Sequence, residues 1–546
     1  MKMADSLGRS AHLDTFARDG LPPRELWPVM DPSLPPLCDY PDDLNIGTVL
    51  LDDAVAAGRG ERPAVLYRDR VWTYADLLDK ANRIANVLTH DMGLVPGNRV
   101  LLRGPNTPML LAAWFAVVKA GGVCVATMPL LRGRELAYIA AKAKVTHALC
   151  DIRFAEELEV ARTESPGLAH LMHFSALGEG GESLDLAMGA APATYADVAT
   201  SALDVALIAF TSGTTGPAKA TMHVHRDLLA VCDCFPRHVA GVREDDRFCG
   251  SPPLAFTFGL GALALFPLRA GASVVLVESF TPETMLKTIQ DYRVTGLYTA
   301  PTAYRAMAAL ALDWDLTSLR LCVSAGEHLP LATSNLWDRV TGIRIIDGIG
   351  STELLHIFIS AAGDDIRPGS TGRAIFGYEA RIVDAAGQPV PPGTPGRLAV
   401  RGPTGCRYLD DPERQRKYVD DGWNLTGDVY TMDEDGYFWY QARSDDMIVS
   451  AGYNISGPEV EGVLMEHPKV VECAVVGLAD EERGQVVSAF VVLKDPADGG
   501  EALVQELQAF VKDRIAPYKY PRRVKFVHSL PRTPTGKLQR FALRDL

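Results

Sequence analysis

VALIAFTSGTTGPAKA, residues 205–220, is an apolar run that ends abruptly in hydroxyl side chains and glycines and then reaches one lysine. Such a run predicts a buried strand, and the residues after the strand can bind an anion through hydroxyl donors, close backbone N–H groups and a mobile positive charge. The residues concerned are Thr211, Ser212, Gly213, Thr214, Thr215, Gly216 and Lys219. A Walker-type loop needs a different glycine spacing and a Ser or Thr after the lysine. We therefore predict a phosphate-binding loop of another kind.

Length and charge narrow the class of protein. The chain has 546 residues, which is too long for one hydrophobic core, so we expect several units. It carries 54 Lys and Arg against 68 Asp and Glu, a formal charge of −14, and no run of five like charges. This balance argues against a nucleic-acid-binding surface. A hydrophobic content of 47% with 22% charged residues is typical of a soluble enzyme.

The nine cysteines are scattered and form no C-x-x-C pair, so neither a disulfide framework nor a zinc site is expected. Residues 1–14, MKMADSLGRSAHLD, lack the apolar core of a signal peptide. The longest apolar run, residues 109–118, ends at Lys119, well short of the ~20 residues that a membrane span needs. We expect a reducing cytoplasm and no membrane partner.

Hydrophobic periodicity predicts alternating strands and helices from about Ala64 to Gly369. Residues 1–45 are rich in proline and predict an extended arm. Thr73, with Asp76 three residues on, predicts the start of a helix. The alternation predicts a parallel sheet with helices on both faces, interrupted by an irregular connection over residues 164–201. Predicted strands lie at 64–68, 100–102, 123–127, 147–150, 273–277, 297–299, 319–324 and 344–347, with helices from 108–119 and 135–142.

The pattern changes after Gly369 to short strands at 378–384, 397–401 and 436–441, joined by Gly and Pro turns, which predicts a small antiparallel barrel or layer. A last α+β unit begins near Asp445. We therefore predict an α/β fold: a large N-terminal domain of parallel α/β sheets with a β-barrel-like subdomain, residues 1–444, and a small mobile C-terminal domain, residues 445–546.

Four further stretches carry chemistry-bearing side chains. They are DGIGSTE at 347–353, WNLTGD at 423–428, which we interpret as a turn that presents Asp428, RSDDMIVSAGYNISGPE at 443–459, and PRTPTGKLQR at 531–540. With the loop at 205–220, this set resembles the adenylate-forming superfamily of acyl-CoA synthetases, aryl-acid ligases and luciferases. The resemblance covers nearly the whole chain.

Within that superfamily the sequence looks most like the benzoate-CoA ligase branch. The similar stretches are GSTELLHIFIS at 350–360, RSDDMIVSAGYNISGPEVE at 443–461 and PYKYPRRV at 517–524. SAHLDTFARDGLPPRELWP, residues 10–28, looks like 2-aminobenzoate-CoA ligases in particular. The resemblance implies an ATP- and Mg²⁺-dependent enzyme that converts an aryl acid, 2-aminobenzoate or benzoate, into an aryl-adenylate and then an aryl-CoA thioester.

The resemblance also implies roles for single residues. The loop from Thr211 to Lys219 would hold the pyrophosphoryl end of ATP, Thr352 would bond the α-phosphate, and Glu353 would help to hold Mg²⁺. Lys537 would meet the negative charge that develops when the acid attacks ATP. The nucleoside would be held by Asp428 on the ribose hydroxyls with Arg443 beside it, and by Gly326, Glu327, Asp347 and Gly348 around adenine.

In the family the C-terminal domain rotates about a hinge, here Asp445, between the two half-reactions. The rotation would withdraw the Lys537 loop and bring residues 450–453 to the site, where Gly452 would let the pantetheine of coenzyme A pass.

By analogy, an acyl pocket with flat aromatic walls would receive the ring. We single out His356 as the polar group near the ring or its ortho substituent. The expected lining is Phe256, Thr257, Phe258, Gly259, Ala303, Tyr304, Ser324, Ala325, Ile349, Gly350 and His356.

The chain departs from the family pattern at Ala220 and Ala442, where glycine is common, which leaves loop detail open. Three alternatives stay open at this point: transfer of the acyl group to a carrier-protein thiol, a non-catalytic nucleotide or acyl binder, and a medium-chain fatty acid as substrate. The expected partners are small molecules, with the chain a monomer or homodimer.

Overall fold

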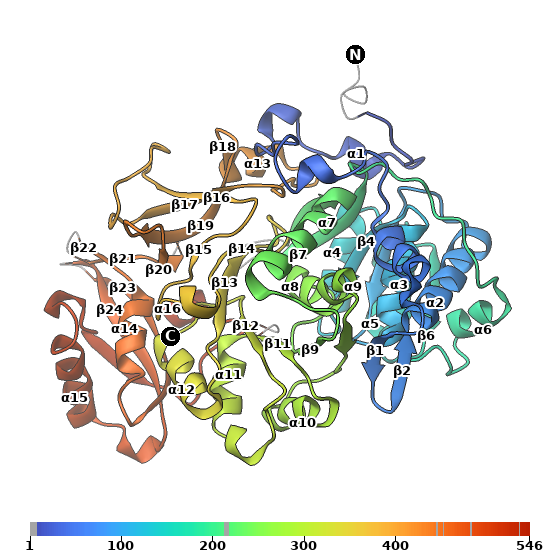
Figure 1. Cartoon of the computed structure of the whole chain (residues 1–546). Coiled ribbons are helices and arrows are strands. Elements are labelled where there is room, and N and C mark those ends of the chain that lie inside the picture. The colour runs from blue at the N-terminus through green and yellow to red at the C-terminus, as the bar shows by residue number, and fades with distance from the viewer. Residues whose placement is uncertain are drawn as a thin grey trace.

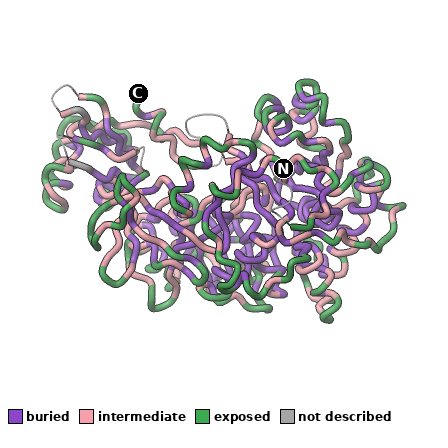
Figure 2. Tube along the Cα trace, turned by 90° about the horizontal axis from the view of Figure 1, so that it is seen from above, coloured by how far each residue is buried: buried purple, intermediate pink, exposed green. Residues whose placement is uncertain are grey.

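The computed structural model describes residues 8–211, 218–443, 446–450, 453–480, 483–533 and 536–545. Its strands form four sheets with six, nine, five and five strands. In Figure 1 the C-terminal unit lies beside the antiparallel sheet formed by β16–β20, away from the blue and cyan elements of the first half of the chain. Buried segments concentrate in the middle of the molecule, and exposed ones line its rim (Figure 2).

The six-stranded sheet has the order β6-β5-β3-β4-β7-β8. Its strands are parallel up to β7, and β8 then runs antiparallel to β7. Helix α3 is fully buried and is apolar up to its last residue, Lys119, which pairs with Asp52 and Asp197. The bounds are β3 Arg99–Arg103, α3 Pro108–Lys119, β4 Val123–Thr127, α4 Gly133–Lys142, β5 His147–Asp151, α5 Ala155–Glu164, β6 His170–Phe174, α6 Ser183–Ala190, β7 Val205–Thr211 and β8 Lys219–Val224. The predicted irregular connection over 164–201 was wrong in part, because it contains β6 and α6.

The nine-stranded sheet has the order β15-β14-β13-β12-β11-β9-β10-β1-β2. It is parallel from β13 to β1, with antiparallel strands at both edges. The two sheets confirm the predicted parallel α/β sheets, and the antiparallel edge strands are an addition that the periodicity did not indicate. The bounds are β1 Pro63–Tyr67, β2 Arg70–Thr73, β9 Arg247–Gly250, β10 Ser273–Val275, β11 Gly296–Thr299, β12 Leu321–Ser324, β13 Ile346–Gly350, β14 Ile357–Ser360 and β15 Arg373–Ala374.

The largest core cluster contains residues of both sheets, such as Leu102 of β3 and Val274 of β10, and so joins them. Helix α2, Tyr74–Asn86, packs in it and begins with the predicted capping box of Thr73 and Asp76. A second cluster lies between the nine-stranded sheet and helices α10 Pro282–Tyr292, α11 Pro301–Ala308 and α12 Leu331–Thr341. The carboxyl ends of the central strands therefore meet between buried layers, where ligands gather in such folds.

The third sheet is antiparallel and confirms the predicted small β subdomain. Its strands are β16 Glu379–Val383, β17 Gly396–Arg401, β18 Val419–Asp420, β19 Trp423–Met432 and β20 Phe438–Arg443. Asp428 lies within β19, so our interpretation of residues 423–428 as a turn was wrong. Gly427 has a φ of +78°, and the register shifts just after it, between Val429 and Tyr430, so the strand is irregular where Asp428 is presented.

The C-terminal unit has cores of its own, built from residues between Ile448 and Leu543. Its sheet contains β21 Ile448–Ser450, β22 Tyr453–Ile455, β23 Val470–Asp480, β24 Gly484–Leu493 and β25 Arg523–Phe526, with helices α14 Gly457–Leu464, α15 Glu501–Lys512 and α16 Arg540–Arg544. Residues 444–445 lie outside the described ranges, so the boundary and hinge at Asp445 stay a prediction.

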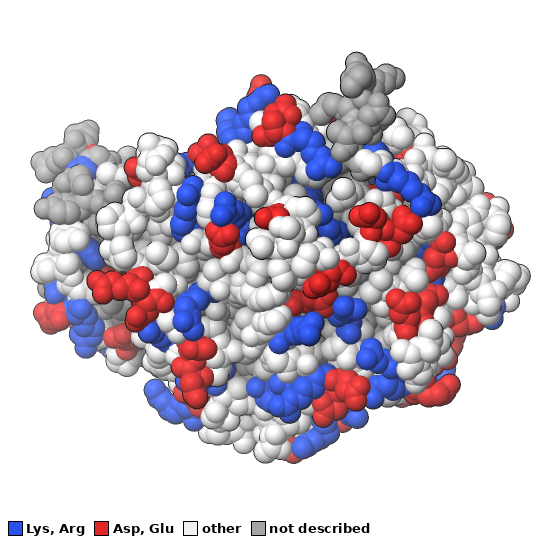
Figure 3. Space-filling model, turned by 45° about the horizontal axis from the view of Figure 1, so that its top comes forward, with Lys and Arg blue, Asp and Glu red and all other residues white. Residues whose placement is uncertain are grey.

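The N-terminal arm is folded rather than merely extended. It contains helix α1, Phe16–Asp19, and it buries Leu21 and Trp27 against the core cluster of the six-stranded sheet. Positive and negative side chains are interspersed over the face drawn in Figure 3. Within the described ranges, no helix is both long and apolar enough to cross a membrane.

Candidate active site

The predicted phosphate loop connects two strands that pair as a hairpin. Thr211 at the end of β7 lies opposite Lys219 at the start of β8. Oγ1 of Thr211 is buried and has no hydrogen-bond partner among the described residues, so it is available to a ligand. Residues 212–217 lie outside the described ranges, and with them Ser212, Gly213, Thr214, Thr215 and Gly216. The methyl group of Ala220 packs in a core cluster, so this departure from glycine is accommodated.

The DGIGSTE stretch forms β13 and the tight turn that follows it. Thr352 and Glu353 lie in this turn, and the hydroxyl of Tyr408 donates a hydrogen bond of 2.7 Å to Oε1 of Glu353. Glu353 is 8% exposed. Among the residues that the structure describes, no donor contacts its second oxygen, and no group of three potential metal ligands occurs. One carboxylate that acts together with substrate phosphates is the usual protein contribution to a Mg²⁺ site, so Glu353 fits that ion.

Asp428 and Arg443 face each other on the neighbouring strands β19 and β20. Nη1 of Arg443 lies 2.9 Å from Oδ1 of Asp428. Burial raises the pKa of Asp428 in spite of this guanidinium. Burial alone would lower the pKa of Arg443, but the Asp428 carboxylate outweighs it and the pKa is raised. A carboxylate that is buried but only singly paired keeps acceptor capacity for hydroxyl donors.

Lys537 brings the C-terminal unit into this site. Burial lowers the pKa of its ammonium group, while the carboxylates of Glu327, Glu353 and Asp428 act against that change and Arg443 adds to it. These groups are thus close enough to Lys537 to interact electrostatically. The neighbouring Arg532 lies 3.9 Å from Glu327, which follows β12 in the N-terminal domain. The contact between Arg532 and Glu327 thus places the segment that carries Lys537 beside the N-terminal domain, and Lys537 interacts electrostatically with Glu327, Glu353, Asp428 and Arg443.

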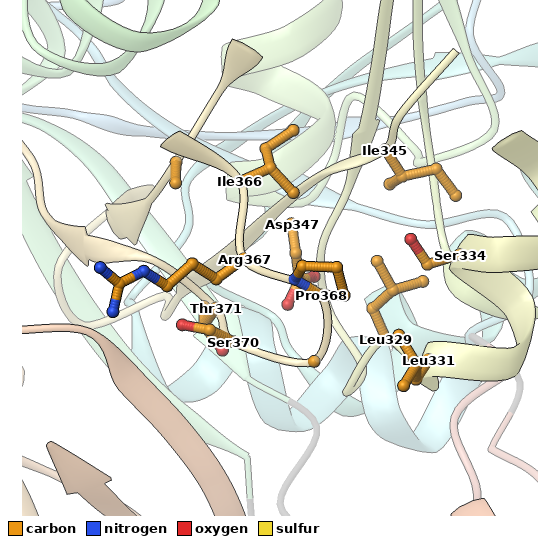
Figure 4. Close-up of a pocket in the computed structure, with 12 residues that line it drawn as sticks. Leu329, Leu331, Ser334, Ile345, Asp347, Ile366, Arg367, Pro368, Ser370 and Thr371 are labelled. Carbon is orange, nitrogen blue, oxygen red and sulfur yellow. The ribbon is translucent and has the colours of Figure 1, made fainter. Parts of the chain in front are cut away.

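Asp347 lines a small recess between β13, α12 and residues 366–371. Figure 4 shows it among Ile345, Ile366, Pro368 and Thr371. Burial raises the pKa of Asp347 to about 8. Its Oδ1 has no partner among the described residues.

Gly326 has a φ of +89°, and a Cβ there would meet no atom within 4 Å, so space is open beside it. Gly348 differs, because a Cβ would come within 2.7 Å of Ile357. Gly326 is thus one of the predicted adenine-binding residues that borders open space.

His356 is buried among aromatic rings. Its ring centroid lies 4.4 Å from that of Phe266, 5.6 Å from Phe258 and 6.1 Å from Phe235. Burial lowers its pKa to about 3, so the ring is neutral at physiological pH. Nε2 lies 3.4 Å from the carbonyl oxygen of Phe258, whereas Nδ1 is buried without a partner among the described residues. Because a carbonyl only accepts, the proton is on Nε2 and Nδ1 is left as an acceptor.

Two of the expected pocket residues pack in another core cluster. The hydroxyl of Tyr304 donates to the carbonyl oxygens of Leu297 and Val323, at 3.0 and 3.1 Å, and its ring packs edge-on against Trp337. Tyr304 and Ala303 belong to the core cluster under α10–α12, as Leu297 does. Neighbouring strand residues point to opposite faces, and Tyr298 contacts Phe258 instead. The structure thus packs Tyr304 and Ala303 in this cluster, and their place in the acyl pocket stays a prediction.

The other predicted lining residues are close to His356 or Phe258 in sequence, or pack in the same core cluster as the aromatic rings around His356. Gly259 is required by packing, because a Cβ at this position would lie 2.0 Å from the carbonyl oxygen of Pro253. Gly350 is required for the same reason, because a Cβ there would lie 2.7 Å from the backbone carbonyl group of His356. Phe256, Thr257 and Phe258 are partly exposed at the start of α8, Thr257–Leu260. Ser324 Oγ is buried without a partner among the described residues, and Ala325 and Ile349 belong to the core cluster of Phe266.

Gly452 lies outside the described residues. The sequence motifs did not indicate Tyr408, which contacts Glu353, or Phe235 and Phe266, which contact His356. In the stretch RYLDDPE at 407–413 Tyr408 stands beside Arg407, but only the structure shows that the arginine is buried, so no local signal indicated Tyr408.

Comparisons with known proteins agree with this geometry. Residues 52–407 match the family model described as AMP-binding enzyme, and residues 459–537 match that of the AMP-binding enzyme C-terminal domain. A benzoate–CoA ligase of Thauera aromatica is 35% identical over 94% of this chain and 98% of its own length.

Two solved structures are similar along nearly the whole chain. The anthranilate CoA ligase AuaEII, in complex with anthranoyl-AMP, aligns with a TM-score of 0.88 at 36% identity over 93% of this chain and 98% of that one. A benzoate CoA ligase from Burkholderia xenovorans LB400 aligns with a TM-score of 0.83 at 33% identity over 92% of this chain and 100% of that one.

Proposed function

The chain belongs to the AMP-binding enzyme family, and on that premise we propose that it joins 2-aminobenzoate to coenzyme A, with benzoate as the competing substrate. It is an AMP-forming aryl-acid–thiol ligase that uses ATP, Mg²⁺ and coenzyme A. The identity of the acid and the roles of single residues are the proposal.

In the first half-reaction a carboxylate oxygen of the acid attacks the α-phosphorus of ATP, and pyrophosphate leaves. Two anions approach each other, so a positive charge at the reacting atoms lowers the barrier. We assign this task to Lys537, whose ammonium group interacts electrostatically with the carboxylates of Glu327, Glu353 and Asp428. Thr352 bonds the α-phosphate, and Glu353 holds Mg²⁺, which would neutralise phosphate charge.

We propose that Asp428 and Arg443 orient the nucleotide. The Asp428 carboxylate accepts from both ribose hydroxyls while Arg443 fixes its rotamer from the neighbouring strand. Adenine enters the open space beside Gly326. We assign Glu327, Asp347 and Gly348 to the same base.

In the second half-reaction the thiolate of coenzyme A attacks the carbonyl carbon of the aryl-adenylate, the C–O bond to phosphate breaks and AMP leaves. Lys537 has no part in this step, because the leaving group is already activated. Before this step the C-terminal domain turns about Asp445, which withdraws Lys537, and Gly452 then lies on the path of the pantetheine.

The observation that carries the choice of acid is the acceptor nitrogen of His356. The ring is neutral, its Nε2–H faces Phe258, and Nδ1 is buried without a partner among the described residues. An unpaired buried acceptor is costly, and an ortho amino group would supply the missing donor. Benzoate has no such donor, and an alkyl chain would leave the rings around His356 without a flat partner.

The experiment is pyrophosphate release with ATP and Mg²⁺ over 2-aminobenzoate, benzoate, hydroxybenzoates, halobenzoates and hexanoate, each with and without coenzyme A. We expect kcat/KM for 2-aminobenzoate to exceed that for benzoate by about ten-fold, or ~1.4 kcal/mol. A higher kcat/KM for benzoate than for 2-aminobenzoate would refute the proposed hydrogen bond from the amino group to His356. A highest kcat/KM for hexanoate would refute the proposal of an aryl pocket.

We also propose that the enzyme works in the cytoplasm as a monomer or homodimer. All nine cysteines are free thiols, and only Cys38 is exposed, which suits a reducing compartment.

A further inference from the structure

A cluster of three fully buried polar side chains lies behind the candidate active site. Nη1 of Arg407 lies 2.6 Å from Oδ2 of Asp227, and Nδ1 of His223 lies 3.6 Å from the same oxygen. Each of the three side chains is 0% exposed. Burial alone would raise the pKa of Asp227, but Arg407 and His223 outweigh it and the pKa is lowered, so the carboxylate is charged. A buried charged cluster of this kind is costly to build, and it fixes the positions of its members.

The cluster reaches the active site through His223. Its Nε2 lies 2.7 Å from the carbonyl oxygen of Thr352, and because that oxygen can only accept, Nε2 carries the proton and donates. The contact bridges 129 positions of sequence, from the end of β8 to the turn after β13. His223 therefore bonds the backbone of a residue that is placed at the α-phosphate.

The turn that receives this bond is strained. Leu355 has a φ of +73°, a left-handed conformation that a bulky side chain rarely adopts. Such strain persists only where surrounding contacts hold it. The Thr352 carbonyl oxygen also accepts from the N–H of Leu355 at 3.2 Å, so the strained residue and His223 share one acceptor.

The segment that carries Arg407 holds the same turn at two more points. Thr404 donates to the carbonyl oxygen of Leu354 at 2.7 Å, and Tyr408 donates to Glu353 at 2.7 Å. The segment 404–408 thus holds three consecutive residues of the turn. It contacts Glu353 and Leu354 directly, and it reaches Thr352 by way of Asp227 and His223.

The N-terminal arm covers the outer side of this cluster. The guanidinium of Arg407 lies 4.6 Å from the ring centroid of Trp27, and that of Arg24 lies 4.4 Å from the same ring. Gln415 ties the arm to the segment, because its Nε2 donates to the carbonyl oxygens of both Leu26 and Cys406. Trp27 lies in residues 10–28, the stretch that looks like 2-aminobenzoate-CoA ligases, and no sequence motif assigned it a role.

We propose that His223 is a positioning residue for adenylation, which holds Thr352 and Glu353 in place through the Thr352 carbonyl, and that Trp27 of the N-terminal arm supports it through Arg407 and Asp227. The inference rests on the roles proposed above for Thr352 and Glu353. Neither His223 nor Trp27 touches the reacting atoms.

The test uses His223→Leu, which removes the donor, and His223→Gln, whose amide N–H can replace Nε2–H. His225→Leu is the matched control, because His225 is also 0% exposed and lies two residues away, yet its Nδ1 accepts from the N–H of Ile46 and not from the turn. Substitutions at Asp227 or Arg407 are avoided, because they would leave an uncompensated buried charge and destabilise the fold.

We expect His223→Leu to raise KM for MgATP about ten-fold and to lower kcat for pyrophosphate release, with KM for coenzyme A unchanged. His223→Gln should stay within about three-fold of the parent enzyme. His225→Leu should leave both KM values unchanged even where thermal stability falls. Trp27→Leu should raise KM for MgATP about three-fold, since Trp27 lies three contacts further from Thr352 than His223 does.

Equal losses in His223→Leu and His223→Gln, or an unchanged KM for MgATP in His223→Leu, would overturn the part given to His223. An unchanged KM for MgATP in Trp27→Leu would overturn the part given to the arm. Thr352→Ala and Glu353→Gln separate this from the proposed function. If those two variants keep full adenylation, the proposed site itself fails, whereas if they lose it and His223→Leu does not, only the present inference fails.

Discussion

Tyr408 donates a hydrogen bond of 2.7 Å to Oε1 of Glu353, although 55 positions of sequence separate the two residues. The bridge between Thr221 and Tyr408 aligns the segment around Tyr408 with β8, directly beyond the phosphate loop. The carboxylate proposed to hold Mg²⁺ is therefore oriented by a neighbour of the phosphate site.

Removal of this hydroxyl should weaken the use of Mg²⁺. We expect Tyr408→Phe to shift the Mg²⁺ dependence of pyrophosphate release to about ten-fold higher concentration, because Glu353 loses its orienting donor. Tyr74→Phe is the control, since Tyr74 is equally buried but donates to the carbonyl oxygen of Ala272, far from the site. Identical Mg²⁺ titrations for Tyr408→Phe and the parent enzyme would refute the orienting contact.

Lys537 should matter in one half-reaction only. We expect Lys537→Ala to lower adenylate formation from acid and ATP by at least about a hundred-fold, because the developing negative charge loses its partner. Thioester formation from preformed aryl-adenylate should change by less than about three-fold. Single-turnover rates of the two half-reactions measure this, with the exposed Lys494→Ala as the control. An equal loss of rate in both half-reactions would contradict a role of Lys537 in adenylation alone.

Asp347 should make stability depend on pH. Its pKa is raised to about 8 from an ordinary 3.8, so the folded state keeps the proton over a range in which the unfolded chain has lost it. Stability from this group is therefore full below pH ~4 and is lost as pH rises toward ~8. Asp347→Asn removes the effect, so the variant should gain stability relative to the parent enzyme between pH 5 and 8, on the order of 1–3 kcal/mol.

Unfolding midpoints of Asp347→Asn and the parent enzyme at pH 5 and pH 8 measure that gain. Asp364→Asn is the control, because this carboxylate is fully exposed. A difference between variant and parent that is the same at both pH values would show that Asp347 is ionised in the fold.

His356 should discriminate between acids rather than support catalysis in general. We expect His356→Ala to lower kcat/KM for 2-aminobenzoate about ten-fold more than for benzoate. Only 2-aminobenzoate has an ortho amino group that would lose its hydrogen-bond partner. Since its pKa is lowered to about 3, the discrimination should not change between pH 6 and 9. His238→Ala, which removes an imidazole stacked on Phe376, is the control. A parallel loss for both acids would reduce His356 to a packing residue.

Periodicity and short motifs predicted much of this molecule. Helix 108–119 and strand 123–127 lie where the sequence placed them, because a proline start and a buried apolar run are local signals. The family, the benzoate-CoA ligase branch and the α/β fold with a small β subdomain are confirmed. Asp428 was misplaced in a turn, since Gly427 suggested one while the pairing of β19 with β17 and β20 is not local.

The contacts that hold the site could not be predicted in the same way. Arg407 and Asp227 are 180 positions apart, and neither has a motif of its own. The packing of Tyr304 against Trp337 of α12 depends on the orientation of α11, which no local pattern of the sequence predicts. The domain boundary at Asp445 and the part given to Gly452 stay predictions.

The central claim is an AMP-forming ligation of an aryl acid to coenzyme A, and a stoichiometric burst experiment tests it most directly. Enzyme, MgATP and 2-aminobenzoate without coenzyme A should release about one pyrophosphate per active site and then stall with bound aryl-adenylate. Addition of coenzyme A should then yield equal amounts of AMP and aryl-CoA. Release of ADP and phosphate, pyrophosphate release that does not depend on the acid, or an adenylate that coenzyme A does not discharge would contradict the claim.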